Sequence, residues 1–292
     1  MAPRVIITGA AGLIGQYLLK SAPRWVPEWA VQGLTRSLLD LTDRSAVSSA
    51  LQRYRPDVII HCAALSRTKD CERDPESAKR INVDATLTLA ALARDARLIF
   101  ISTGDVFDGS AGWYDESAQP NPVNVYGRTK LEAERGVLEH PPHSVVRIVL
   151  TAGTSLTGDR SFVEDMSRAA KAGHDVTLYA DEFRCPLPAG VIARALWEFA
   201  RQDKPGLYHL GGSERLSRWE IGEVLLPWYP ELRGRLVKSS SRSHPGARRP
   251  ADLSLVCEKI QRLLTFRLPG LRSWLTERRQ CRDDLWDYEN GH

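Results

Sequence analysis

Short apolar runs alternate with segments of helical spacing through the first half of the chain. The runs are rich in branched residues and have the length of strands; they cover residues 5–8, 31–34, 57–61, 98–102 and 145–150. Strands that alternate with helices are typical of a parallel sheet with helical crossovers. The run around Ile59 is continuously apolar, as expected for a strand covered on both faces. The pattern predicts an α/β fold with a doubly wound parallel sheet.

The apolar pattern loosens beyond Leu150. Two segments with the spacing of amphipathic helices and one late strand follow, at residues 161–173, 191–201 and 206–210. Ser217, with Glu220 three positions later, predicts a capping box at the start of a helix over residues 217–226. The second half therefore predicts a smaller unit that is less regular than the first.

Composition and charge exclude several classes of protein. The formal charge of +4, from 40 basic and 36 acidic residues, is too small to indicate a nucleic-acid partner. The first residues lack the apolar core of a signal peptide, and no apolar run approaches a membrane span. The cysteines are odd in number and scattered, which favours a reducing compartment and gives neither a disulfide framework nor a zinc site: Cys62, Cys71, Cys185, Cys257 and Cys281. We expect a cytoplasmic protein with no metal and no membrane partner, and a homodimer is left open.

One segment departs from the even mixture of charges. Residues 233–249 contain six basic side chains and no acid. A solvated, mobile loop is the simpler interpretation. The alternative is a clamp on the diphosphate of a nucleotide-linked substrate, because the guanidinium fork matches phosphate oxygens.

Three glycines follow the first predicted strand and precede a helix. In Gly9-x-x-Gly12-x-x-Gly15, one glycine lets the chain turn with a positive φ, one lets backbone amides approach a diphosphate, and one lets the helix pack closely on the sheet. The helix N-terminus adds partial positive charge. The position between a strand and a helix favours this interpretation over a plain turn. We therefore predict a dinucleotide site that also includes the intervening Ala11, Leu13 and Ile14.

The end of the second predicted strand indicates which dinucleotide binds. An acid at this position would accept hydrogen bonds from the 2′-hydroxyl of NAD, and none is present. Arg36 and Ser37 instead offer a cation and a hydroxyl, which suit the 2′-phosphate of NADP. We expect NADP(H) rather than NAD(H); the alternative is an Arg36 that points into solvent.

Three side chains near the middle of the chain suit the reduction of a ketone. Tyr126 and Lys130 lie one helical turn apart after the helix-start signals Pro122 and Asn124, and Thr103 follows the fourth predicted strand at the carboxyl edge of the sheet. Hydride transfer to a ketone leaves an alkoxide that needs a proton; a tyrosine can donate it, and a nearby ammonium would lower the pKa of the phenol. Thr103 would hold the substrate oxygen. The alternatives are a surface Tyr-Lys pair and a threonine bonded to the backbone.

With these residues the chain resembles the extended short-chain dehydrogenase/reductases and, within them, the dTDP-4-dehydrorhamnose reductases. The resemblance extends from about residue 4 to about residue 275. It rests on the glycine turn, Asp40-Leu41-Thr42-Asp43, residues 55–60, Ala63-Ala64, Asn82-Val83, Ser102-Thr103, residues 106–109, 121–131 and 206–210, and Arg249-Pro250.

The resemblance implies a Rossmann sheet with a smaller C-terminal substrate-binding subdomain. We expect residues 1–152 to bind NADP and residues 153–280 to form most of the substrate-binding subdomain while sharing strands and helices with the first. Residues 281–292 are then a tail that is frayed or packs on a neighbouring molecule.

The resemblance also implies hydride transfer from NADPH to the 4-keto carbon of a nucleotide-activated deoxysugar, with Tyr126 as the proton donor. Lys130 would in addition bond to the nicotinamide ribose. The further cofactor contacts that it implies are Asp40, Leu41, Ala63 and Ala64, and the predicted substrate contacts are Thr103, Gly104, Asp105, Tyr126, Arg184 and Arg249.

Two departures from the family's pattern leave other functions open. Family members have an acid and an aromatic after Ser-Thr, where this chain has Gly104 and Asp105, and a tryptophan expected after the fifth strand is replaced within residues 148–150. Both places face the sugar in the family, so the sugar and nucleotide of the substrate stay open. A non-catalytic NADP-binding regulatory subunit is one alternative. A nucleotide-sugar epimerase or dehydratase is another, although the dehydratase needs an Asp-Glu pair after Thr103 and the epimerase an acid near Arg36.

Overall fold

The computed structural model describes residues 2–243, 249–278 and 285–286. Its centre is a six-stranded sheet in the order β10-β5-β4-β3-β1-β2, and every neighbouring pair is parallel. The strands are β1 (Arg4–Thr8), β2 (Ala30–Leu34), β3 (Val58–His61), β4 (Arg97–Thr103), β5 (Ser144–Ile148) and β10 (Gly206–Leu210). The strand order reverses direction between β1 and β3, so the predicted doubly wound α/β fold is confirmed.

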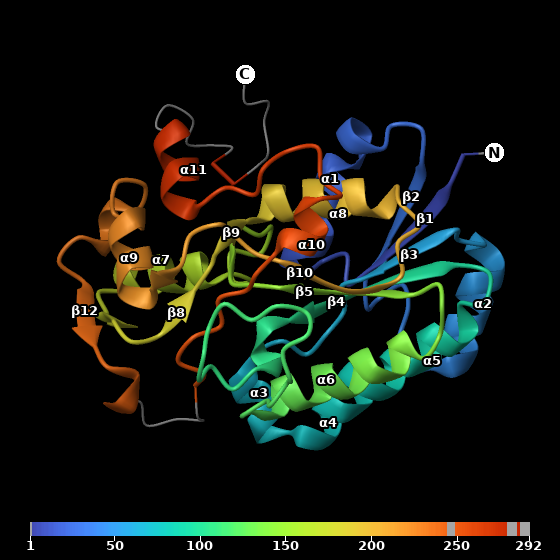
Figure 1. Cartoon of the computed structure of the whole chain (residues 1–292), viewed down its shortest axis with the longest axis horizontal. Coiled ribbons are helices and arrows are strands. Elements are labelled where there is room, and N and C mark those ends of the chain that lie inside the picture. Colours follow the sequence, from blue (N-terminus) through green and yellow to red (C-terminus); the bar gives the residue numbers. More distant parts are fainter. Residues whose placement is uncertain (1, 244–248, 279–284, 287–292) are drawn as a thin grey trace.

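Helices cover both faces of this sheet (Figure 1). One face carries α1 (Leu13–Trp25) and α8 (Ala189–Ala200); the other carries α2 (Arg44–Tyr54), α3 (Thr68–Arg73), α4 (Pro75–Lys79), the π-helical turn η1 (Arg80–Asp84), α5 (Ala85–Leu92) and α6 (Val125–Leu138). Successive strand residues point to opposite faces. Val5 and Ile7 therefore join the core beneath α1 and α8, whereas Ile6 joins the core beneath α2, α5 and α6.

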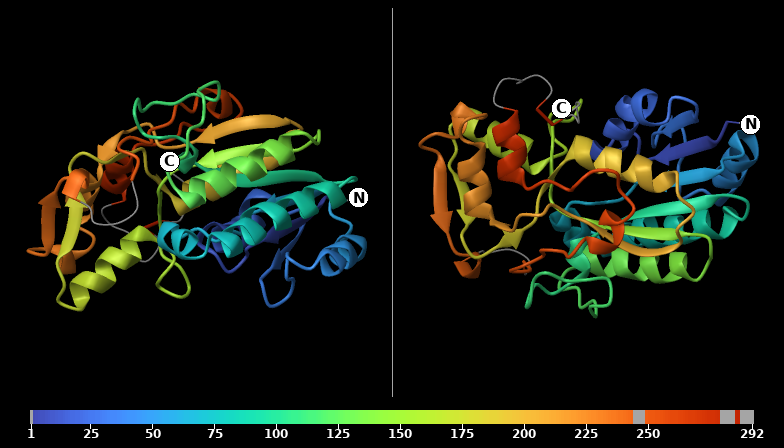
Figure 2. Two further views of the ribbon diagram at one scale, coloured as in Figure 1. Left: turned by 90° about the horizontal axis from the view of Figure 1, so that it is seen from below. Right: turned by 45° about the horizontal axis from the view of Figure 1, so that its top comes forward.

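The second half of the chain adds a smaller unit beside the carboxyl ends of the strands (Figure 2). Its strands form three two-stranded sheets: β6 (Thr151–Ala152) with β9 (Leu187–Pro188), β7 (Val176–Tyr179) with β12 (Leu236–Ser239), and β8 (Phe183–Arg184) with β11 (Leu216–Ser217). Its helices are α7 (Phe162–Lys171), α9 (Arg218–Leu225), η3 (Pro230–Leu232), η4 (Ser241–Ser243), α10 (Glu258–Gln261) and α11 (Leu271–Glu277). The capping box predicted from Ser217 and Glu220 is confirmed at the start of α9, and a second one, of Ser161 and Glu164, begins α7.

Two expectations for this half are wrong in detail. The run over residues 145–150 is not one strand, because β5 ends at Ile148 and the chain re-enters a strand only at Thr151, where β6 pairs with β9. The basic segment is not simply a loop, because β12 within it pairs in parallel with β7. Residues 244–248 of that segment lie outside the described residues.

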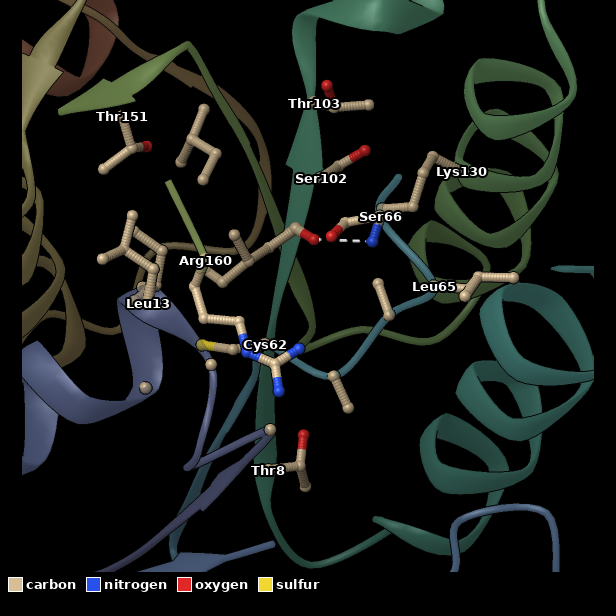
Figure 3. Close-up of a pocket in the computed structure, with 18 of the residues that line it drawn as sticks. Thr8, Leu13, Cys62, Leu65, Ser66, Ser102, Thr103, Lys130, Thr151 and Arg160 are labelled. Atoms are coloured by element: carbon tan, nitrogen blue, oxygen red, sulfur yellow. Dashed lines mark hydrogen bonds between the residues drawn. The ribbon is translucent and has the colours of Figure 1, made fainter. Parts of the chain in front are cut away.

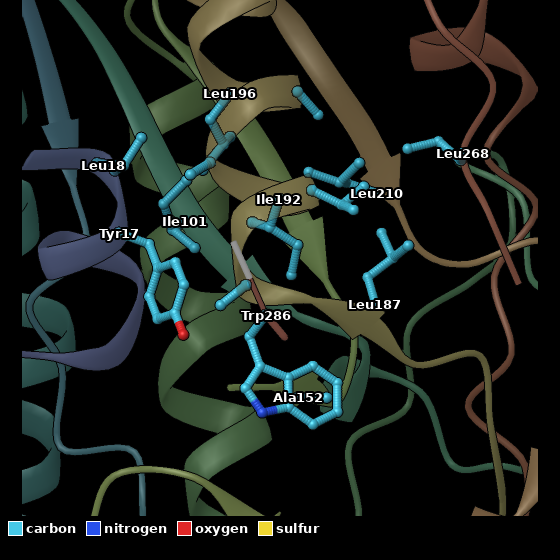
Figure 4. Packing of buried hydrophobic residues seen from close by; sticks show 14 of the residues in the cluster. Tyr17, Leu18, Ile101, Ala152, Leu187, Ile192, Leu196, Leu210, Leu268 and Trp286 are labelled. Atoms are coloured by element: carbon cyan, nitrogen blue, oxygen red, sulfur yellow. The ribbon is translucent and has the colours of Figure 1, made fainter. Parts of the chain in front are cut away.

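Two residues near the end of the chain belong to the core. Leu285 and Trp286 are buried; the Trp286 carbonyl accepts a hydrogen bond from the Gly190 N–H at 2.8 Å, and its indole N–H donates to the Tyr229 hydroxyl at 3.0 Å. Figure 4 shows Trp286 in the same apolar cluster as Tyr17 of α1. The expectation of a frayed or neighbour-bound tail is therefore wrong for these two residues, and the rest of the tail lies outside the described residues.

The described cysteines are all free, and Cys281 lies outside the described residues. Burial raises the pKa of the Cys62 and Cys185 thiols to about 12, so both stay protonated near neutral pH. Within the same described ranges, no helix is both long enough and apolar enough to cross a membrane.

Candidate active site

A cavity of about 720 Å³ opens at the carboxyl edge of the sheet, where it meets the smaller unit. Most of the predicted site residues line it: Gly9, Ala11, Gly12, Leu13, Ile14, Gly15, Arg36, Asp40, Leu41, Ala63, Ala64, Thr103, Gly104, Asp105, Tyr126, Lys130 and Arg184. Ser37 and Arg249 are not part of its wall. The volume is that of a site for a nucleotide-sized ligand.

The glycine turn suits a diphosphate because it has no side chains in the way. Gly9 has a φ of +67°, and a Cβ there would lie 2.6 Å from the backbone nitrogen of Ala63. Gly12 is the N-cap of α1, and no side chain caps this helix end. The first-turn N–H groups therefore have no side-chain acceptor beside the cavity, which is the arrangement that binds phosphate oxygens.

The residues after β2 form another part of the wall. Arg36 is exposed and lines the cavity. The Asp40 carboxylate accepts hydrogen bonds from the Thr42 N–H at 2.9 Å and the Thr42 hydroxyl at 2.8 Å, and these hold the pKa of Asp40 below its usual value. The Ser37 hydroxyl bonds to that of Thr35 at 2.8 Å. Of the two predicted residues after β2, Arg36 thus lines the cavity and could contact a ligand. The Ser37 hydroxyl instead bonds within its own loop.

Thr103 and Tyr126 meet where β4 and α6 face the cavity. Thr103 ends β4, and its hydroxyl donates to the Asp105 carboxylate at 3.0 Å. Tyr126 lies in the first turn of α6, which Asn124 caps by accepting a hydrogen bond from the Gly127 N–H at 2.7 Å. Burial and the Asp105 carboxylate raise the pKa of Tyr126, and a hydrogen bond with Thr103 opposes this. The phenol therefore keeps its proton at neutral pH.

Lys130 lies one helical turn after Tyr126 and is almost completely buried. Its Nζ donates to the Ile101 carbonyl at 2.7 Å and lies 3.8 Å from the centre of the Phe100 ring. Figure 3 shows Lys130 in the cavity wall. Burial lowers the pKa of this ammonium to about 7, and the Glu134 carboxylate acts in the opposite direction. The expectation that Lys130 lowers the pKa of Tyr126 is wrong for this structure, because Nζ is directed at β4 and burial dominates the phenol.

A buried ion pair lies behind β4. The side chains of Glu134 and Arg147 are 2% and 3% exposed and approach to 2.6 Å. Ser102 of β4 donates to Glu134 at 2.5 Å, and His209 lies 3.3 Å from Arg147. Burial, reinforced by Arg147, lowers the pKa of His209 to about 3, so the imidazole is neutral. The negative charge of Glu134 and the positive charge of Arg147 therefore balance within a buried cluster that joins β4, β5 and α6.

A second cluster of charges lies in the smaller unit. The buried Glu182 carboxylate accepts hydrogen bonds from Arg184 at 2.9 Å and from Arg249 at 2.6 and 2.8 Å. Arg218 is a third guanidinium that interacts with Glu182, and burial lowers its pKa to about 10. These four side chains carry an excess of positive charge. Arg184 lines the cavity, whereas Arg249 lies against Glu182.

Sequence reasoning missed several residues of the wall. Arg160 enters from the segment between β6 and α7, Phe162 begins α7, and Ser66 follows β3. Ser66 could have been found, because it follows the same strand as Ala63 and Ala64. Arg160 gives no signal in the sequence, since only the fold brings its segment to the cavity.

The fold and the cavity place this chain in the class of Rossmann-fold proteins with a dinucleotide-type glycine turn. A family model described as RmlD substrate binding domain matches residues 3–282. The chain belongs to this family, and the resemblance to the dTDP-4-dehydrorhamnose reductases is confirmed.

Proteins similar to this chain include two groups, dTDP-4-dehydrorhamnose reductases and beta subunits of methionine adenosyltransferase 2. A dTDP-4-dehydrorhamnose reductase of Sinorhizobium fredii is 33% identical over 282 residues, which cover 91% of this chain and 93% of that protein. Methionine adenosyltransferase 2 subunit beta of Danio rerio is 31% identical over 303 residues, covering 98% of this chain and 91% of that protein. The crystal structure of dTDP-4-dehydrorhamnose reductase from Bacillus anthracis in complex with NADP has a TM-score of 0.84 at 26% identity, covering 94% of this chain and 97% of that chain.

Proposed function

We propose that this chain is an NADP(H)-dependent reductase that acts on the 4-keto group of a nucleotide-linked deoxysugar. The observation that carries the proposal is that Thr103, Tyr126 and Lys130 line the same cavity as the glycine turn. A dTDP-4-dehydrorhamnose reductase that is 33% identical to this chain supports the same class of reaction.

NADP(H) fits the residues along the cavity. The first turn of α1 would take the diphosphate, Arg36 the 2′-phosphate, and Lys130 the nicotinamide ribose. The NADP in the similar Bacillus anthracis structure supports NADP(H) over NAD(H). When bound, NADPH supplies the hydride.

Tyr126 is the proposed proton donor. Its raised pKa keeps the phenol protonated at neutral pH, which is the state that a donor needs. An alkoxide is a much stronger base than a phenolate, so the phenolic proton moves downhill to the reduced oxygen. The Thr103 hydroxyl, which now donates to Asp105, would instead hold the substrate oxygen in line. The Lys130 ammonium, which is directed at β4, has its proposed role at the nicotinamide ribose rather than at the phenol.

The test is NADPH oxidation by the purified chain with dTDP- and UDP-linked 4-keto-6-deoxysugars. We expect turnover of at least one sugar, and Tyr126→Phe lowers kcat about a thousandfold while NADPH still binds. Tyr54→Phe, outside the cavity wall, is the matched control and retains the activity. Tight NADPH binding without turnover of any sugar would contradict the proposal.

A regulatory subunit is the second candidate. The similarity to methionine adenosyltransferase 2 subunit beta, at 31% identity over 98% of this chain, favours it. In this case the chain binds NADP and associates with a catalytic subunit of another enzyme. Co-elution with a methionine adenosyltransferase catalytic subunit, together with no turnover of the sugars, would support this candidate over the reductase.

A further inference from the structure

The segment that joins β6 to α7, residues 153–161, is hydrogen-bonded to two elements of the sheet half. On the side of α1, the Gln16 side chain accepts a hydrogen bond from the Leu156 N–H at 2.8 Å. On the side of β3, Arg67 donates to the Asp159 carbonyl at 2.5 Å. The segment is therefore fixed relative to the glycine turn, although it belongs to the second half of the chain.

Arg160 points from this segment into the cavity (Figure 3). Its backbone N–H donates to the Glu164 carboxylate at 2.8 Å, and the same carboxylate completes the capping box of α7. The Nε atom lies 3.2 Å from the Asp159 carboxylate and 3.4 Å from the Thr157 hydroxyl. Among the described residues, the Nη1 and Nη2 atoms have no hydrogen-bond or ion-pair partner. The backbone is thus anchored, while the end of the guanidinium is left for a ligand.

The guanidinium extends toward the part of the cavity where the glycine turn lies. Figure 3 shows it reaching down toward the strand ends that carry Thr8 and Cys62, on the side of Leu13, which begins α1. The other cations of the described wall come from different elements: Arg36 after β2, Lys130 on α6 and Arg184 on β8. A dinucleotide places its doubly charged diphosphate at this helix N-terminus, so a guanidinium here meets a ligand of opposite charge.

We propose that Arg160 binds the diphosphate of the dinucleotide cofactor, so that the backbone amides of the glycine turn and a guanidinium fork hold the same phosphates. This assignment rests on the proposed use of NADP(H) and adds a cofactor contact from the second half of the chain. The diphosphate of a nucleotide-linked substrate is the competing ligand. The positive cluster that reaches the cavity through Arg184 already suits that ligand, which favours the cofactor for Arg160.

Isothermal titration calorimetry of the full chain with NADP⁺ and with 2′-AMP tests this assignment. 2′-AMP keeps the adenosine and the 2′-phosphate but has no diphosphate. We expect Arg160→Gln to weaken NADP⁺ binding about tenfold while 2′-AMP binding changes less than about twofold, and Arg160→Lys to restore part of the loss. Arg36→Gln weakens both ligands. Arg262→Gln, an exposed charge loss at the end of α10 outside the cavity wall, is the matched control and leaves both affinities unchanged.

An unchanged NADP⁺ affinity in Arg160→Gln would overturn the assignment, as would an equal loss for 2′-AMP. A weaker affinity for dTDP with an unchanged affinity for NADP⁺ would assign Arg160 to the substrate instead. If the unaltered chain does not bind NADP⁺ at all, the proposed function fails, and this result is distinct from a failure of the Arg160 assignment alone.

Discussion

Glu134 and Glu182 are both buried carboxylates bound by arginines, but their surroundings differ. Glu134, in the sheet half, pairs with the single buried Arg147 and accepts a hydrogen bond from Ser102. Glu182, in the smaller unit, pairs with Arg184 and with Arg249, whose side chain is 39% exposed. The charges of the first cluster balance and are buried, whereas the second cluster has excess positive charge and reaches the cavity through Arg184.

This difference separates a cluster that joins elements of the fold from one that carries excess positive charge at the cavity. A balanced, buried pair fixes the elements that it joins, and breaking it leaves an uncompensated charge. An unbalanced cluster attracts an anion, such as the diphosphate of a nucleotide-linked substrate. The buried pair in the sheet half thus fixes packed elements, whereas the cluster in the smaller unit brings unbalanced positive charge to the cavity.

The largest expected effect is that of Glu134→Gln on stability. The substitution leaves Arg147 buried without a counter-charge, and we expect the free energy of unfolding to fall by about 4 kcal/mol, measured by urea denaturation. The double variant Glu134→Gln/Arg147→Met should recover part of this loss, because it removes both charges. A loss near zero in the single variant would show that the pair is not structural.

The second effect is a pH dependence of stability that originates at Lys130. The pKa of Lys130 is about 7 in the folded protein and 10.5 in the unfolded chain, so the unfolded chain binds more protons between these values. The free energy of unfolding therefore rises with pH across this window, by up to about 1.4 kcal/mol per pH unit, and the gain is lost as the pH falls from 10.5 to 7. Urea unfolding without added cofactor should show this slope, and Lys130→Met should remove it. Equal slopes in the two proteins would contradict this origin.

A charge loss in the second cluster should be less damaging than Glu134→Gln only where it leaves Glu182 paired. The loss of this carboxylate leaves the buried Arg184 and Arg218 without their counter-charge, so the comparison is better made with Arg249→Gln. The Arg249 side chain is 39% exposed, and Glu182 keeps Arg184 and Arg218, so we expect a decrease of about 2 kcal/mol in the free energy of unfolding. The same urea titrations measure both variants. A decrease as large as that of Glu134→Gln would remove the distinction between the two clusters.

The smallest expected effect concerns ligand binding at the second cluster. Arg184→Gln should weaken dTDP binding about tenfold, because it removes a cation from the cavity wall, and should leave NADP⁺ binding unchanged. Calorimetry with both ligands measures this, and Arg262→Gln, an exposed charge loss in the same half, is the control. Equal losses for dTDP and NADP⁺ would mean that Arg184 does not distinguish substrate from cofactor.

The sequence predicted elements well where a local pattern has a single cause. The sheet strands and the capping box of Ser217 were found because each depends on neighbours in the chain. The run over residues 145–150 was taken as one strand, but Val149 and Leu150 are apolar where they line the cavity after β5 has ended. β12 was missed because its partner β7 lies far away in the sequence.

In the candidate site, too, residues with a local sequence signal could be predicted, whereas features that depend on tertiary packing could not. Thr103 and Tyr126 were found from their positions at a strand end and a helix start, and both line the cavity. The pKa of Tyr126 could not be predicted, since it depends on burial and on where the Lys130 ammonium points. Arg160 was missed because only the packing of the second half on the first brings it to the glycine turn.

The burial of Trp286 has a consequence for how the chain folds during synthesis. Trp286 shares an apolar cluster with Tyr17, so this core joins the beginning of the described chain to its end. Contacts between such distant segments form slowly compared with local helices, and they wait until residue 286 has left the ribosome. The glycine turn and the strands around it are complete much earlier. The nascent chain can therefore assemble its cofactor-binding half while the apolar face of α1 still awaits its last covering residues.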